Sequence, residues 1–229
     1  LEFRRVLFRS DWVNGVPYTF EGYDTYQDSG ATTDTDQIRA TGSSNVDIGL
    51  TGFSSAAGIE QIVNATTNGS LVRLLGDWKA NTLDFSSVSF LGSNFLLDGG
   101  DGADTMTGSA LADRLRGGRD GDTLDGKGGS DSYEVSGAGP DWVNGVPYTF
   151  EGYDTYKDSG ATTDTDQIRA TGSSNVDIGL TGFSSAAGIE QIVNATTNGS
   201  LVRLLGDWKA NTLDFSSVSF LGSNFLLDG

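Results

Sequence analysis

Aspartate recurs at a fixed interval in the middle of the chain. Between residues 99 and 135, four nine-residue units follow one another, each with Asp at its sixth position and a large apolar residue at its eighth. The aspartates are Asp104, Asp113, Asp122 and Asp131, and the apolar residues are Met106, Leu115, Leu124 and Tyr133. Carboxylates that are brought together repel one another, and a hard divalent cation such as Ca²⁺ removes the conflict because it takes roughly six to eight oxygen ligands. The spacing therefore predicts calcium binding.

Each unit also predicts the backbone that would position its aspartate. A six-residue polar half, in which Gly permits backbone angles closed to other residues, precedes a three-residue strand whose middle side chain points inward. Two units make one coil of 18 residues, and parallel strands of successive coils stack about 4.8 Å apart. We therefore expect an all-β fold, a parallel β-roll or β-solenoid, with two internal apolar columns. The expected ladder, counted in steps of nine, comprises Val88, Leu97, Met106, Leu115, Leu124 and Tyr133.

The same stacking places Asp104 over Asp122 and Asp113 over Asp131, and the glycine turns supply backbone carbonyls as further ligands. The candidate ligands besides the four aspartates are Asp120, Gly99, Gly100, Gly102, Gly117, Gly118, Gly126, Gly128 and Gly129. The second unit keeps a single glycine, so we expect one or two good sites on the Asp104/Asp122 side and a weak or empty side at Asp113/Asp131. A solvated, flexible linker is the alternative, but a linker would not hold Asp and a large apolar residue in phase.

The pattern Gly-Gly-x-Gly-x-Asp-x-U-x, where U is a large apolar residue, resembles the hemolysin-type calcium-binding nonapeptide of the repeats-in-toxin (RTX) family. The resemblance covers residues 99–135 alone, and Leu111 and Asp120 depart from it at the fourth position. It implies a bacterial protein exported in one step as an unfolded chain by type I secretion. Folding would then follow calcium binding outside the cell.

A long internal duplication surrounds this block. Residues 11–99 match residues 141–229 at every position but one, Gln27 against Lys157. Short apolar runs separated by Gly, Ser, Thr and Asn predict strands and turns in both copies. We expect degenerate solenoid rungs rather than a separate β-sandwich module. Asp24 and Tyr26 resemble a worn nonapeptide, and Asp34 with Asp36 would hold a further cation or form a polar turn.

The first ten residues, LEFRRVLFRS, have no counterpart in the duplication. We interpret residues 1–10 as foreign to the protein, with a genuine N-terminal cap as the alternative. The expected divisions are a first copy at 11–98, the nonapeptide block at 99–135, and a linker with a truncated second copy at 136–229. An assembly error in the gene sequence is a further explanation for the duplication.

Composition argues against several functions. The 229 residues carry a formal net charge of −17, which disfavours nucleic acid and anionic membranes as partners. Cys and His are both absent, so common zinc sites and the imidazole general base are missing. We find no apolar run long enough for membrane insertion, no opening signal peptide and no catalytic residue. We therefore expect a protein that is not an enzyme and whose main partner is calcium.

The sequence thus favours a calcium-binding structural repeat region of a large tandem-repeat adhesin. It would form an extended stalk or adhesive surface, for which host-surface or glycan ligands would be partners. One alternative is the calcium-binding tail of a secreted hydrolase or toxin whose catalytic domain lies outside these residues. Another is a carbohydrate-binding module that uses Trp78 and Trp208, although packing in the core or at the edge of a rung is the favoured interpretation of both tryptophans.

Overall fold

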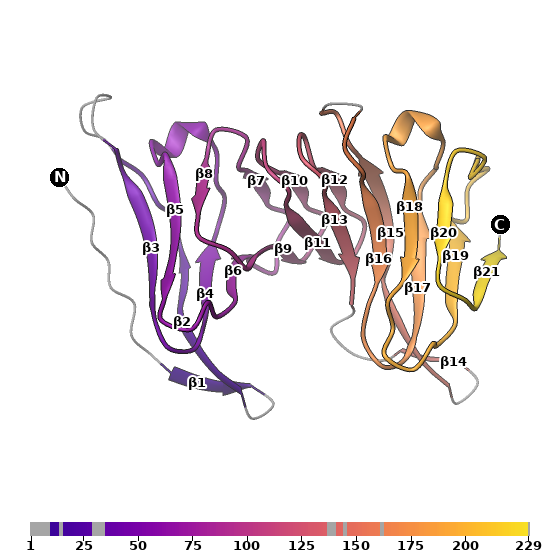
Figure 1. The fold of residues 1–229 in the computed structure, drawn as a ribbon, viewed down its shortest axis with the longest axis horizontal. Helices are drawn as coiled ribbons and strands as arrows, with labels where there is room; N and C mark the ends of the chain where they lie inside the picture. Colours follow the sequence, from indigo (N-terminus) through magenta and orange to yellow (C-terminus); the bar gives the residue numbers. More distant parts are fainter. Residues whose placement is uncertain are drawn as a thin grey trace.

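Successive coils of the chain stack along one axis in the computed structural model. Their strands pair in parallel, apart from two antiparallel pairs, residues 10–13 with 16–19 and residues 141–143 with 146–148. The result is a parallel β-solenoid of about eight turns (Figure 1), which confirms the predicted all-β class. The structure describes residues 10–13, 16–28, 35–136, 141–143, 146–160 and 163–228. The segment interpreted as foreign lies outside these residues except for Ser10.

The strands divide into those of the first copy, the block and the second copy. The first copy forms β1 (Ser10–Val13), β2 (Val16–Asp24), β3 (Gln37–Gly42), β4 (Asn45–Leu50), β5 (Gln61–Thr66), β6 (Val72–Gly76), β7 (Thr82–Asp84) and β8 (Ser89–Leu91). The block forms β9 (Phe95–Asp101), β10 (Thr105–Thr107), β11 (Arg114–Arg119), β12 (Thr123–Asp125) and β13 (Ser132–Val135). The second copy forms β14 (Asp141–Val143), β15 (Val146–Lys157), β16 (Gln167–Ala170), β17 (Asn175–Leu180), β18 (Gln191–Asn194), β19 (Val202–Gly206), β20 (Ser219–Leu221) and β21 (Phe225–Asp228).

Helical structure is confined, in the part of the chain that the structure describes, to two short 3₁₀ turns. They are η1 (Ser55–Ala57) and its second-copy counterpart η2 (Ser185–Ala187). Among these same residues no helix has the length and apolar character needed to cross a membrane.

Two apolar columns fill the block, as the nine-residue ladder predicts. On one side Leu115 of β11 pairs with Leu97 of β9 and with Tyr133 of β13. On the other side Met106 of β10 pairs with Leu124 of β12. All five side chains are at most 1% exposed, so their burial stabilises the coil through the hydrophobic effect.

The ladder does not extend to Val88, and that part of the prediction is wrong. Met106 pairs with Leu83 of β7, whereas Val88 lies just before β8, a strand that pairs with β5. The reason is coil length: the register offset is 18 residues in the block, from Leu97 to Leu115, but 26 in the first copy, from Asp47 to Arg73. Counting by nines therefore fails outside the block.

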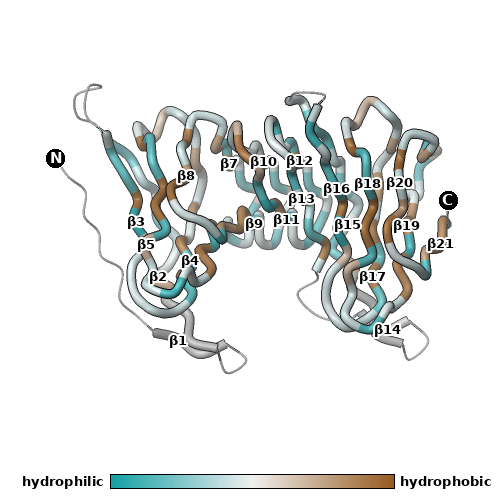
Figure 2. The backbone as a smooth tube through the Cα atoms, viewed as in Figure 1, coloured by the Kyte–Doolittle hydropathy of each residue, from teal (hydrophilic) through white to brown (hydrophobic). Residues whose placement is uncertain are grey.

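The longer coils of the copies carry a third strand. In the first copy β3, β5 and β8 form a sheet of their own beside the two sheets that enter the block. Figure 2 shows hydrophobic stretches along β5 and β8, and again along β18 and β20, with more hydrophilic turns between them. The copies are thus degenerate solenoid rungs, as predicted, and not a β-sandwich.

The block is continuous with the second copy. Strand β12 pairs with β15, and β13 pairs with β16. Lys157, the single position at which the copies differ, lies on β15 opposite Asp125 of β12, with its Nζ 3.3 Å from Asp125 Oδ2. The one substitution between the copies therefore falls at the contact between block and copy.

Candidate metal centre

Two columns of carboxylates follow the turns of the solenoid, one on each side of the block. The first, called here the Asp122 column, consists of Asp104, Asp122 and Asp154. The backbone N–H of Asp104 donates to Asp122 Oδ1 at 2.7 Å, and that of Asp122 donates to Asp154 Oδ1 at 2.9 Å. At its start, the N–H of Asn81 donates to Asp104 Oδ1 at 2.7 Å. The predicted stacking of Asp104 on Asp122 is therefore confirmed, and a third carboxylate extends it.

The second column, called here the Asp131 column, consists of Asp113, Asp131 and Asp166. The N–H of Asp113 donates to Asp131 Oδ1 at 2.8 Å, and that of Asp131 donates to Asp166 Oδ1 at 2.7 Å. The N–H of Asp166 continues the series to Glu190 Oε2 at 2.8 Å. The predicted stacking of Asp113 on Asp131 is also confirmed.

The ladder hydrogen bonds occupy one oxygen of each carboxylate and leave others without a partner. Asp104 Oδ2, Asp122 Oδ2 and Asp131 Oδ2 are buried and accept no hydrogen bond, and the three residues are at most 2% exposed. Among the described residues, none of the three forms an ion pair with Lys or Arg. A buried, unpaired charge is strongly destabilising, so these positions require a proton or a cation.

The pKa values of these carboxyl groups also reflect the cost of burying an unpaired negative charge. Burial raises the pKa of Asp104 to about 7 and those of Asp122 and Asp131 to about 8; the ladder hydrogen bonds oppose this, while neighbouring carboxylates add to it. Burial also raises the pKa of Asp113 to about 6. At Asp125, by contrast, hydrogen bonds from Ser159 and the nearby lysines outweigh burial and lower the pKa.

Glycine at the first position of each unit leaves room for these oxygens. A Cβ built on Gly99 would collide with the carboxylate of Asp104 and with the carbonyl of Gly117 in the next coil. A Cβ on Gly117 would likewise meet Asp122, and one on Gly126 would meet Asp131. Each free carboxylate oxygen thus lies beside a glycine backbone, and a carboxylate oxygen is a ligand that suits a hard cation such as Ca²⁺.

Glycine at the second and fourth positions of a unit allows the backbone conformation of the turn and does not make room for a carboxylate. Gly100 and Gly102 have φ angles of 99° and 106°, in the left-handed region that side chains disfavour. Asp120 and Lys127 adopt the same region at 76° and 75°, so the turn tolerates other residues there. Leu111 of the second unit does not adopt it, which explains why that unit can dispense with glycine.

The predicted ligands separate onto the two sides. Close backbone approaches place the turn of Gly99, Gly100 and Gly102 against that of Gly117 and Gly118, on the Asp122 side. Asp120 is exposed on that side, where its charge contributes to the raised pKa values of Asp104 and Asp122. The remaining predicted glycines, on the Asp131 side, are Gly126, Gly128 and Gly129.

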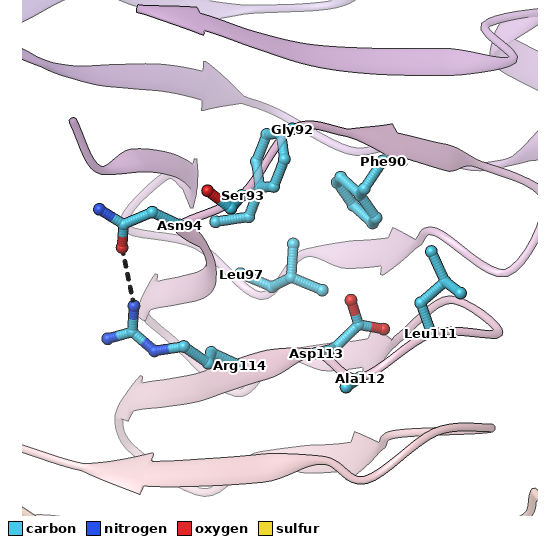
Figure 3. A pocket seen from close by; sticks show the side chains of 10 residues that line it. Phe90, Gly92, Ser93, Asn94, Leu97, Leu111, Ala112, Asp113 and Arg114 are labelled. Atoms are coloured by element: carbon cyan, nitrogen blue, oxygen red, sulfur yellow. Dashed lines mark hydrogen bonds between the residues drawn. The ribbon is translucent and has the colours of Figure 1, made fainter. Parts of the chain in front are cut away.

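Asp113 ends the Asp131 column beside a cavity. The cavity has a volume of about 260 Å³ and lies between the turn after β8 and the turn at Leu111 (Figure 3). Asp113 Oδ2 accepts a hydrogen bond of 2.5 Å from the N–H of Ser109. Asp113 therefore differs from Asp131, whose second oxygen is free, and the expected weakness of this side remains a prediction.

Several rungs that stack on the block were not predicted from the sequence. Asn81 and Leu83 belong to GDWKANTLD, which repeats the nonapeptide with Asn at the sixth position and Leu at the eighth. Asp154 and Tyr156, the counterparts of Asp24 and Tyr26, stack on the third unit, with Tyr156 opposite Leu124. Their D-x-Tyr core is the sequence signal for this rung.

Asp34 and Asp36, predicted to hold a further cation or to form a polar turn, lie where the described part of the first copy resumes. Asp34 lies outside the described residues, whereas the N–H of Asp36 donates to Glu60 Oε2 at 2.8 Å. The same bond joins Asp166 to Glu190 in the second copy.

Trp78 and Trp208 are not in the core, so the core part of the predicted core or rung-edge packing is wrong. Trp78 is 65% exposed and Trp208 is 86% exposed. Each stands in a turn that faces solvent, with the neighbouring lysine over its ring, Lys79 at 5.4 Å and Lys209 at 5.3 Å. Trp78 also packs edge to face with Tyr23, at 5.9 Å between ring centroids.

Fold and site together define the class of this protein: a parallel β-solenoid with stacked, buried carboxylates in its turns. This architecture is compatible with an RTX-like β-roll. Comparisons of the chain with protein-family models, with curated proteins and with solved structures find no match.

Proposed function

We propose that this chain is a calcium-binding structural repeat region of the RTX type. The observation that carries the proposal is the set of free, buried oxygens on Asp104, Asp122 and Asp131, each beside a glycine backbone. Ca²⁺ accepts both carboxylates and carbonyls in flexible geometry, whereas Mg²⁺ demands a tight octahedron and keeps its waters. Calcium is therefore the better match.

Calcium would act on folding. Bound between stacked turns, it would neutralise carboxylates that otherwise disfavour the coil at neutral pH. Binding free energy then becomes folding free energy, and at a calcium concentration 100-fold above Kd each site adds about 2.7 kcal/mol. The block would thus close the solenoid that runs through both copies, giving an extended stalk or adhesive surface outside a bacterial cell.

The test is a calcium titration of the whole chain by calorimetry, with circular dichroism in calcium and in chelator. We expect calcium to release or absorb heat and to raise the β-sheet signal. Asp122→Asn should weaken calcium binding at least about tenfold, or about 1.4 kcal/mol, and more than the matched variant Asp113→Asn. Unchanged β-sheet content in chelator with no heat of binding would contradict the proposal, and the reverse order of the two variants would contradict the choice of side.

A carbohydrate-binding role is the second candidate, because both Trp78 and Trp208 are exposed. Exposed indole rings can stack on sugar faces, and the duplication provides one such ring in each copy. Quenching of tryptophan fluorescence by oligosaccharides, lost in the double variant Trp78→Ala and Trp208→Ala, is the expected result. A glycan array without any signal would remove this candidate.

A further inference from the structure

The two copies are nearly identical in sequence, but they have different neighbours on one face. In the second copy the last two strands of the block, β12 and β13, pair with β15 and β16. The first-copy equivalent of β16 is β3, and within the described residues β3 pairs with β5 alone. We call this face of a copy the docking face; it consists of β3 and residues 25–27 in the first copy, and of β16 and residues 155–157 in the second.

Backbone hydrogen bonds hold the block on the docking face of the second copy. The N–H of Thr155 donates to the carbonyl of Asp122 at 2.8 Å. On the other strand of the face, the N–H of Gln167 donates to the carbonyl of Asp131 at 3.0 Å. Bonds of this kind join main chains, so they are open to any extended segment that lies in the same register.

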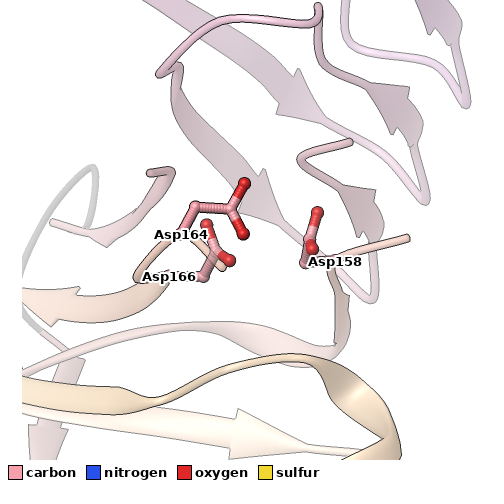
Figure 4. A group of neighbouring side chains, drawn as sticks. All are labelled: Asp158, Asp164 and Asp166. Atoms are coloured by element: carbon pink, nitrogen blue, oxygen red, sulfur yellow. The ribbon is translucent and has the colours of Figure 1, made fainter. Parts of the chain in front are cut away.

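Two carboxylates that precede β16 add selectivity for a nonapeptide turn. Asp166 Oδ1 accepts the N–H of Asp131 at 2.7 Å, and Asp164 Oδ2 accepts that of Gly129 at 3.0 Å. Figure 4 shows both carboxylates beside Asp158, at the start of the second copy. Gly129 has a φ angle of 101°, a conformation that favours glycine. These carboxylates therefore recognise the Gly-x-Asp part of a nonapeptide unit.

An aromatic contact and a charge pair complete the interface. Tyr133 is fully buried and packs edge to face with Tyr156, at 5.7 Å between ring centroids. The Tyr133 hydroxyl donates to the carbonyl of Lys157 at 2.5 Å. The Lys157 side chain places its Nζ 3.3 Å from Asp125 Oδ2. The second copy therefore recognises the last two units of the block through backbone, carboxylate, aromatic and charged groups together.

The first copy presents the strand of the same face already folded. β3 spans six residues and β16 four, so this strand forms at least as fully with β5 as its one described neighbour. The segment that would face β12 differs, because β15 continues to Lys157, whereas β2 ends at Asp24 and residues 25–27 form no strand. Tyr26 is partly buried, and its counterpart Tyr156 is 4% exposed. The segment thus becomes a strand in the copy that has the block beside it.

We propose that the docking face of the first copy binds a nonapeptide segment of another polypeptide, one whose last two units match residues 117–136. A sheet edge accepts an extended segment in this way, since backbone hydrogen bonds supply affinity and side-chain contacts supply selectivity. The same residues in the second copy already hold such a segment, so the docked geometry is seen within the molecule. The contacts join protein groups, so docking is a separate claim from calcium binding by the block.

The experiment is a calorimetric titration of the full chain with a synthetic peptide of residues 117–136, in calcium and in chelator. We expect one peptide per chain, because the tethered block occupies the face of the second copy. A peptide with Tyr133→Ala should bind at least about tenfold more weakly, because that side chain is fully buried in the contact. Hydrogen exchange should slow in the proteolytic fragment that carries Gln27 and not in the one that carries Lys157.

Arg39→Pro tests the receiving edge. In the second copy the N–H of Thr171 donates to the carbonyl of Val135 of the block at 3.1 Å. Alternate residues of a strand point to the same neighbour, so the N–H of Arg169, and that of its counterpart Arg39, face the docking side. Proline removes that donor and is tolerated on an edge strand. The variant should keep the wild-type circular dichroism spectrum and bind the peptide at least about tenfold more weakly.

Gln27→Lys tests the face in the opposite direction. It gives the first copy the charge that Lys157 directs at Asp125, and should tighten peptide binding by about two- to fivefold, an effect that high salt removes. Such a gain of affinity does not arise from misfolding. Absence of peptide binding, equal binding by Arg39→Pro, or slower exchange only outside the Gln27 fragment would overturn the proposal. Peptide binding by a chain that shows no heat of calcium binding would support docking and contradict the proposed function of the block.

Discussion

Without metal, the stability of this solenoid should fall as pH rises through neutrality. Burial raises the pKa values of Asp104, Asp122 and Asp131 to about 7, 8 and 8, against 3.8 for an ordinary aspartate. Between about pH 5 and pH 7 the folded chain therefore holds protons that the unfolded chain has released. The stability that these protons provide is complete below the unfolded pKa and is lost as pH passes the folded pKa.

The slope follows from the number of carboxyls involved. Each carboxyl that is protonated only in the folded chain lowers the free energy of unfolding by about 1.4 kcal/mol per pH unit. Three such carboxyls together would give about 4 kcal/mol per pH unit. Exposure to solvent and the ladder hydrogen bonds both reduce this combined effect. We expect a slope between these values, about 1.4 to 4 kcal/mol per pH unit. A typical domain stability of about 5–15 kcal/mol would then be largely lost within a few pH units.

The assay is urea denaturation in calcium-free buffer at a series of pH values from about 5 to 8. The unfolding midpoint should fall steadily with pH. In saturating calcium the trend should reverse, because the ion binds only the ionised carboxylates. Asp131→Asn removes one titrating group but keeps the ladder acceptor, so its metal-free slope should be shallower than that of the wild type. A metal-free stability that is constant or rises over this range would refute the reasoning.

Three further predictions concern the packing of the coils. Leu115→Ala should lower the free energy of unfolding by about 2–5 kcal/mol in calcium, measured by urea denaturation, because Leu115 is fully buried. Gly117→Ala should cost about 1–3 kcal/mol and also weaken calcium binding in calorimetry, because the added Cβ collides with the Asp122 carboxylate. Lys157→Gln, which makes the two copies identical, should cost less than about 1 kcal/mol and should lose its effect in high salt, because Lys157 is half exposed.

The block was predictable because its spacing leaves few alternatives. Asp and a large apolar residue at fixed positions of a nine-residue unit determine both the coil length and the facing pairs. The structure accordingly places Asp104 against Asp122 and Met106 against Leu124. Strand period, glycine turns and charge all point to the same arrangement there.

For the two copies, the sequence predicted the fold class but not which residues stack on one another. Asp122 and Asp154 are 32 residues apart, and Asp131 and Asp166 are 35 apart, because longer turns enter between the rungs. A fixed period cannot follow such turns, so the sequence does not show which second-copy residues stack on the block. The exposure of Trp78 was missed for another reason: a nonapeptide-like turn projects its third residue into solvent, and composition alone does not reveal that position.

Buried carboxylates are accommodated in two different ways in this fold. In the sheet, Asp98 accepts from Arg73 and Arg116, so the protein itself supplies the countercharge. In the turns no such partner exists among the described residues for Asp104 or Asp122.

A neutral residue occupies one rung of the same column. Asn81 stands in register above Asp104, and its N–H joins the same ladder without carrying a charge. The ladder uses one oxygen of each carboxylate as the acceptor of a single N–H, and an amide oxygen can accept the same bond. The fold pairs the buried aspartates of its sheets, Asp47, Asp98 and Asp177, with arginine, but none of the described residues pairs those of the turns in this way. Under the proposed function, stability at neutral pH would then come from a cation outside the chain. That is the physical basis for expecting calcium, and not sequence pattern alone, to decide whether the solenoid forms.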